Sequence, residues 1–122
     1  MPAYYVPIGA TDKEMAVLRN LPAGAYSVDA LAGLFGTSPG NYVACDILAN
    51  GASIEYVQAP PRVAEYQVLL QGTVDSPDPL TLKLVCNTYG GTGTTMGNFG
   101  TSLRATRVGS LVRTTAPDGM TP

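Results

Sequence analysis

The stretch from Leu80 to Cys86 constrains the fold most, because its apolar residues recur at every second position. It reads Leu-Thr-Leu-Lys-Leu-Val-Cys, so the three leucines and the cysteine share one face of an extended chain. A helix would distribute these side chains around its surface, whereas a half-buried β-strand places them all on one side. The alternation therefore predicts a strand with one face in a core.

The only other cysteine, Cys45, lies in a similar run from Val43 to Ile47 and is also predicted to face inward. The chain starts Met-Pro-Ala-Tyr-Tyr-Val-Pro, without the basic start and apolar middle of a signal peptide, so we expect synthesis in a cytosol. Buried thiols are usual in that compartment. A Cys45–Cys86 disulfide is the alternative if the protein later leaves the cell. Both states stay open at this point.

The rest of the chain predicts an all-β fold. Fourteen glycines and ten prolines among 122 residues favour short strands and turns. We expect seven or eight strands in an antiparallel β-sandwich of jelly-roll or immunoglobulin-like kind. The expected strands cover residues 15–21, 25–31, 41–49, 53–58, 63–74, 80–86 and 103–112.

Turns and ends divide the chain further. Asn50-Gly51 predicts a hairpin turn, and a break in the alternation after Arg107 predicts a β-bulge. Residues 87–100, rich in Gly and Thr, predict an exposed loop. We therefore expect a sandwich domain at 15–112 between an N-terminal arm, 1–14, and a C-terminal arm, 113–122.

Composition argues against catalysis. The chain has no histidine, which excludes a Ser-His-Asp triad, a Cys-His pair and a histidine zinc site. Two cysteines alone cannot complete a structural zinc site, and the glycines at 90–97 lack the Gly-Lys-Ser/Thr of a phosphate loop. We expect no enzyme, no catalytic residues, no cofactor and no metal.

The surface residues favour a protein or sugar partner. The net charge is −2, and no apolar run is long enough to span a membrane, so we expect neither nucleic acid nor membrane as partner. Seven tyrosines against two phenylalanines suit an interface or a sugar-binding surface. The residues available for an exposed aromatic platform are Tyr42, Tyr56 and Tyr89.

A longer pattern resembles a known group of proteins. It comprises Leu21-Pro22-Ala23-Gly24-x-Tyr26, Val43-x-Cys45, Leu82-x-Leu84-x-Cys86 and Leu103-x-Ala105-x-x-Val108-Gly109-Ser110-Leu111. Over roughly residues 17–112 it is similar to small actinobacterial and actinobacteriophage β-sandwich proteins, including phage virion accessory proteins. The resemblance implies a sandwich with paired cysteines and carries no catalytic signature.

The resemblance implies a phage virion protein made in the host cytoplasm. We expect a capsid decoration protein that binds the major capsid protein on the outside of the shell as a homotrimer. The alternatives are a receptor- or carbohydrate-binding module of a phage tail and a secreted bacterial binding module. The candidate partner contacts are Tyr4, Tyr5, Arg104, Arg107 and Arg113.

Overall fold

A computed structural model describes residues 6–36, 42–60, 64–89, 95–97 and 101–109, and these residues form nine strands and no helix. The strands are β1 (Val6–Ile8), β2 (Lys13–Leu21), β3 (Gly24–Gly36), β4 (Tyr42–Ala49), β5 (Ala52–Ala59), β6 (Ala64–Ser76), β7 (Leu80–Tyr89), β8 (Thr95–Gly97) and β9 (Ser102–Val108). The described part of the chain therefore contains no helix that could cross a membrane.

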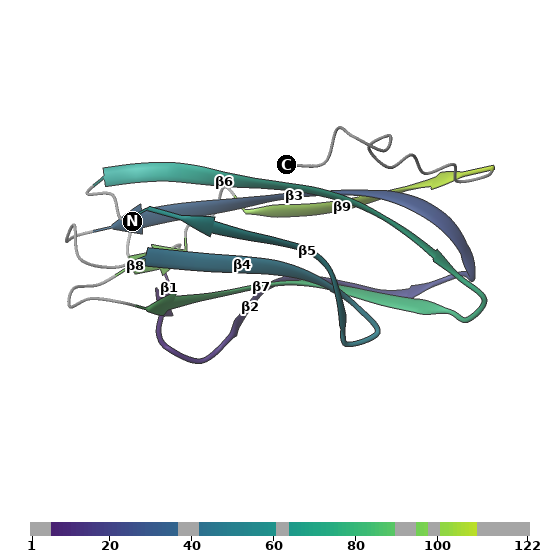
Figure 1. Cartoon of the computed structure of the whole chain (residues 1–122), viewed down its shortest axis with the longest axis horizontal. Helices are drawn as coiled ribbons and strands as arrows, with labels where there is room; N and C mark the ends of the chain where they lie inside the picture. The colour runs from purple at the N-terminus through teal and green to yellow at the C-terminus, as the bar shows by residue number, and fades with distance from the viewer. Residues whose placement is uncertain (1–5, 37–41, 61–63, 90–94, 98–100, 110–122) are drawn as a thin grey trace, which may run out of the picture.

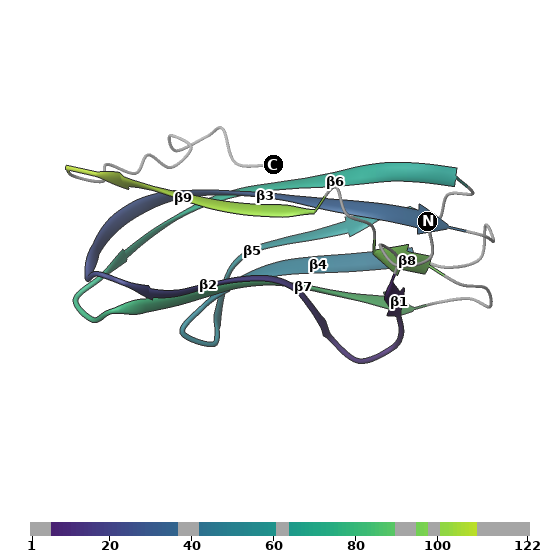
Figure 2. The ribbon, with the colours of Figure 1, turned by 180° about the vertical axis from the view of Figure 1, so that it is seen from behind.

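The strands form two antiparallel sheets that pack face to face (Figure 1). Sheet A has the order β1-β8-β3-β6, with β9 also paired to β3, and sheet B has the order β2-β7-β4-β5. Strands β6 and β5 lie along one long side of the sandwich, and β9 and β2 lie along the other (Figure 2). The prediction of an all-β antiparallel sandwich is confirmed.

The core is built from the inward faces that alternation predicted. Leu82, Leu84 and Cys86 of β7 are fully buried, as are Val28 of β3 and Ile47 of β4. Burying one such side chain stabilises the fold by roughly 1.5–3 kcal/mol, so these faces hold the two sheets together.

The predicted hairpin turn is also confirmed. Asn50 and Gly51 join β4 to β5 with φ angles of 49° and 88°, as a two-residue turn between twisted strands requires. The Asn50 side chain donates to the Pro79 carbonyl at 3.1 Å and accepts from the Thr81 amide at 2.9 Å. This turn is therefore fastened to the start of β7.

Part of the predicted N-terminal arm pairs with a sheet, and one predicted loop is wrong. Strand β1 pairs with β8, and Ile8 is 4% exposed in the core. The predicted loop at 87–100 contains the end of β7 and the three residues of β8, where Thr95 is 1% exposed. The C-terminal arm, 113–122, lies outside the described residues.

The bulge predicted after Arg107 is absent from the described part of β9. Pairing with β3 runs without a register shift from Ser102 to Val108. Arg107 is opposite Tyr26, on the inward parity of the strand, and its guanidinium carbon lies 6.0 Å from the centre of the Tyr26 ring. The break in hydrophobic alternation is thus an arginine that covers a buried tyrosine.

Candidate functional site

The outer face of sheet B carries a pair of stacked tyrosines. Tyr42 at the start of β4 is opposite Tyr89 at the end of β7. Their ring centroids are 5.4 Å apart, the ring planes meet at 24°, and the residues are 42% and 39% exposed. Such a pair presents flat apolar surface to solvent at a fixed position.

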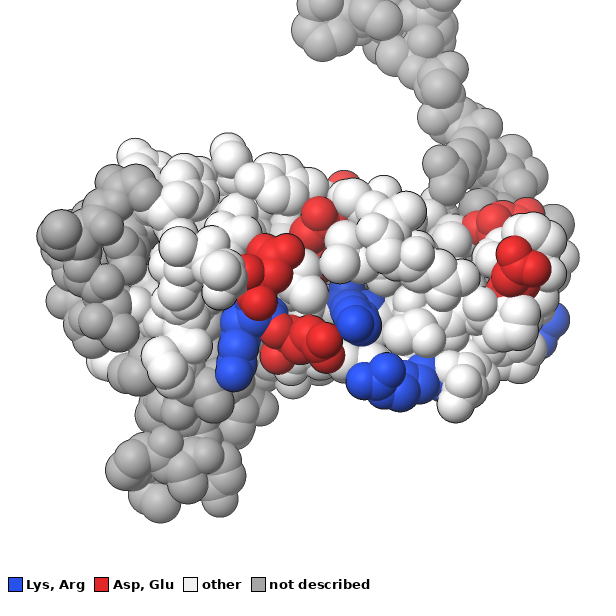
Figure 3. Space-filling model, turned by 90° about the horizontal axis from the view of Figure 1, so that it is seen from below, with Lys and Arg blue, Asp and Glu red and all other residues white. Residues whose placement is uncertain are grey.

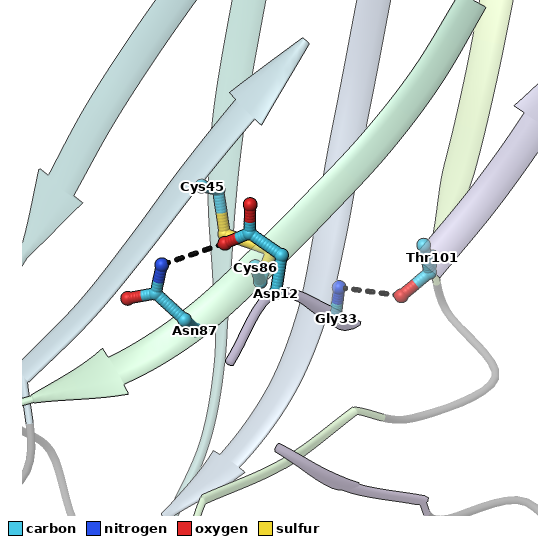
Figure 4. The surroundings of a disulfide bond; sticks show 6 residues. All are labelled: Asp12, Gly33, Cys45, Cys86, Asn87 and Thr101. Atoms are coloured by element: carbon cyan, nitrogen blue, oxygen red, sulfur yellow. Dashed lines mark hydrogen bonds between the residues drawn. A yellow bond between two sulfur atoms is a disulfide. The ribbon is translucent and has the colours of Figure 1, made fainter. Parts of the chain in front are cut away.

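The same alignment of β4 with β7 that places the two rings opposite each other also places the two cysteines opposite each other (Figure 4). Cys45 and Cys86 are directly opposite each other in β4 and β7, with Cα atoms 4.1 Å apart, and are joined as a disulfide. Tyr42 lies three residues before Cys45, and Tyr89 three residues after Cys86. An odd offset reverses the face of a strand, so the sulfurs lie in the core and the rings lie outside.

A third tyrosine extends the aromatic surface. Tyr56 of β5 is opposite Asp46 of β4, on the same outer face, and is 52% exposed. Asp46 is four positions along β4 from Tyr42, a span of about 13 Å. The three predicted platform tyrosines therefore lie on one face, and we call that face, with Ala44, Gln58 and Asn87, the tyrosine face.

Small and polar side chains occupy the row between the rings. Ala44 is 4% exposed and is opposite Gln58 of β5 and Asn87 of β7. The Gln58 side-chain amide donates to the Tyr56 hydroxyl at 3.0 Å, and the Asn87 amide donates to Asp12 Oδ1 at 2.8 Å (Figure 4). Because alanine is small, the surface is lower at Ala44 than at its neighbours, and the polar groups of Gln58, Asn87 and Asp12 lie beside it.

Sequence patterning did not predict Gln58 and Asn87 as members of this site. The order of strands in a sheet is needed to make them neighbours of the tyrosines. A Cys45–Cys86 pair assumed to be directly opposite would have supplied that order, because it fixes Ala44 against Asn87.

Charges of both signs gather over the middle of the same face (Figure 3). Lys83 and Glu14 form an ion pair at 3.2 Å, and Ser53 donates to Asp46 Oδ1 at 2.7 Å. Because acidic and basic side chains are interspersed here, this surface offers no single-sign field for a highly charged ligand.

Metal ligands do not assemble on the described surface. No group of three acidic or cysteine side chains among those residues could hold a metal ion. At the far end of the outer face, a shallow hollow of about 250 Å³ is lined by Arg19, Leu48, Asn50, Gly51, Thr81 and Lys83. This hollow does not include the three tyrosines.

The predicted partner contacts are only partly described. Tyr4, Tyr5 and Arg113 lie outside the described residues. Arg104 is exposed on β9, opposite Asp29. Arg107 donates from Nη2 to the Ala23 carbonyl at 2.9 Å, so its guanidinium stabilises the start of β3.

No protein-family model and no curated protein matches this chain. Among solved structures, the chain is similar to the C-terminal domain of EclA, a sugar-binding protein, with a TM-score of 0.51 and 13% identity. The alignment covers 84% of this chain and 76% of that one. At this identity the likeness shows a shared fold.

Proposed function

We propose that this chain is a non-catalytic binding module that holds a neutral glycan on the tyrosine face. The observation that carries the proposal is the exposed, stacked pair of Tyr42 and Tyr89, with Tyr56 on the same face. An exposed aromatic ring leaves apolar surface in contact with water. Three such rings on one open face therefore suit a surface that a ligand covers.

The chemistry of the face fits a pyranose chain. A tyrosine ring is negative on its face and attracts the weakly positive C–H groups on the flat side of a sugar ring. The amide groups of Gln58 and Asn87 supply both donors and acceptors, which match vicinal hydroxyls. The span of about 13 Å between Tyr42 and Tyr56 leaves room for more than one sugar unit.

The face is also held in shape before a ligand arrives. Its members lie on paired strands, and Asn87 and Tyr56 are each fixed by a side-chain hydrogen bond. Preorganised side chains lose little conformational entropy on binding, which favours affinity. The fold likeness to a sugar-binding domain supports the same class of ligand.

The capsid-decoration hypothesis stays a separate prediction. The similarity reported above does not link this chain to a phage or an actinobacterium, and both tyrosines among its candidate contacts, Tyr4 and Tyr5, lie outside the described residues. Electron microscopy of particles with and without the protein is the measurement for it.

Binding of the labelled protein to a glycan array, followed by titration calorimetry with the best neutral ligand, tests the proposal. Tyr42→Ala and Tyr89→Ala should each weaken binding at least about tenfold, which equals about 1.4 kcal/mol. Tyr42→Phe keeps the ring and should bind within about threefold of the unmodified protein, and Thr106→Ala, on the outer face of sheet A, should bind equally well. An array without a neutral ligand, or full affinity in Tyr42→Ala, would overturn the proposal.

A further inference from the structure

The sheet edges of this sandwich are protected unequally. An edge strand exposes backbone donors and acceptors that pair readily with another strand, and proteins block this with short strands, prolines, charges or bulges. Among the described strands, the edges of the two sheets are β1, β9 and β6 in sheet A, and β2 and β5 in sheet B.

Four of these edges carry such a device. β1 is three residues long and contains Pro7, and β9 carries Arg104 and Arg107. β2 has charged side chains and two register shifts against β7, and β5 has Glu55 and a shift against β4. Each feature discourages the addition of a further strand.

The central part of β6 has none of these four protecting features: short length, proline, charge or a register shift. The strand is 13 residues long and pairs with β3 without a register shift. From Tyr66 to Val74 it contains no charged residue and no proline. Strand β5 passes under its inner side, where a Cβ on Gly72 would lie 3.4 Å from Glu55 Cβ, and so does not extend sheet A.

β6 also presents an unusual apolar side chain. Leu69 is 58% exposed on the outer face of sheet A, and it is the only aliphatic residue among the exposed large apolar residues of the described chain. It borders a hollow of about 210 Å³ whose lining includes Leu31 and the polar residues Asp29, Gln71 and Arg104. A strand added beside β6 would therefore cover Leu69 as well as the edge.

We propose that β6 pairs antiparallel with β6 of a second copy of this chain, so that the two copies of sheet A become one continuous sheet. The two-fold axis passes beside Leu69, which is then directly opposite Leu69 of the partner subunit. This arrangement satisfies the edge and covers the exposed leucines in one step.

The register is chosen to bury Leu69, and it is compatible with charge and size. Centring the pair on Leu69 places Glu65 opposite a threonine and Tyr66 opposite a glycine of the other copy, so that no like charges meet. A shift of the centre to Leu70 would place Glu65 opposite an aspartate, Asp75 in each copy, and like charges directly opposite destabilise a sheet. The self-complementary register is the reason for choosing a second copy as the occupant.

Sedimentation velocity of the full chain over a range of concentrations tests the proposal. The unmodified protein should sediment as a species of about 25 kDa, twice the 12.6 kDa of one chain. Leu69→Lys places two like charges on the axis and should give a folded monomer, checked by circular dichroism. Thr106→Lys, an equivalent change at an exposed position of β9, should stay dimeric.

A cysteine substitution tests the register. Leu69→Cys should form a disulfide between copies under mild oxidation, whereas Gln71→Cys, two residues from the axis, should not. A monomeric, trimeric or aggregated unmodified protein would overturn the proposal, and so would a Leu69→Lys variant that remains a dimer. A dimer that only Gln71→Cys links would overturn the register.

Discussion

Leu84 and Lys83 are neighbours in β7 whose side chains point to opposite faces of sheet B. Leu84 is fully buried between the sheets, and Lys83 pairs with Glu14 at the surface. Leu84→Ala should lower the free energy of unfolding by about 2–5 kcal/mol, because the substitution leaves a cavity in the core. Lys83→Ala is the matched control and should cost no more than about 1 kcal/mol, since the ion pair is partly exposed. Chemical denaturation measures both, and a Leu84→Ala loss as small as that of the control would place Leu84 outside the core.

The alternation of apolar and polar residues predicted which side chains face the core. It did not predict which side chains on the outer face are buried by their neighbours. Leu80, Leu82, Leu84 and Cys86 were predicted on the inner face, and all four are buried. The same alternation places Val85 on the opposite, outer face, yet it is only 4% exposed, because β7 has a strand on each side whose outer side chains cover it. The period of a strand gives the face of a side chain, whereas its burial depends on neighbours that are distant in sequence.

At the scale of the elements, the β4–β5 turn depends on backbone geometry that glycine supplies. Gly51 has a φ of 88°, and a Cβ added there would meet no neighbouring atom within 4 Å, so a side chain causes backbone strain without a clash. Gly51→Ala should therefore lower the free energy of unfolding by about 1 kcal/mol. Gly9→Ala is the control: it also has open space and lacks the positive φ, so it should change stability by less than about 0.5 kcal/mol. Equal effects in thermal or denaturant unfolding would contradict the assignment of the turn.

Elements with a long alternation or a strong turn signal could be predicted, and elements that exist only through pairing could not. Strands β3, β4, β6 and β7 each repeat every second residue over much of their length. Strands β1 and β8 have three residues each, and they form because they pair with each other and β8 with β3. The tyrosine face combines both kinds: its three tyrosines could be named from the sequence, but Gln58 and Asn87 join them only because β4, β5 and β7 are adjacent.

At the scale of the whole molecule, the two proposals make a joint prediction. An antiparallel pair of β6 strands has its two-fold axis normal to the sheet, so both copies of sheet B turn their outer faces in the same direction. Two tyrosine faces would then meet one glycan-coated surface together, and the second contact would form at a high effective concentration.

Leu69→Lys should therefore separate affinity from avidity. Its affinity for a free neutral oligosaccharide should equal that of the unmodified protein, because Leu69 lies on the opposite sheet from the tyrosines. Its retention on a surface densely coated with the same sugar should fall by at least about tenfold, since one contact replaces two. Surface plasmon resonance at high and low sugar density measures the difference, and Thr106→Lys should behave as the unmodified protein at both densities. A weaker affinity for free sugar in Leu69→Lys would place Leu69 in the glycan site, and unchanged retention at high density would show that the two faces do not bind together.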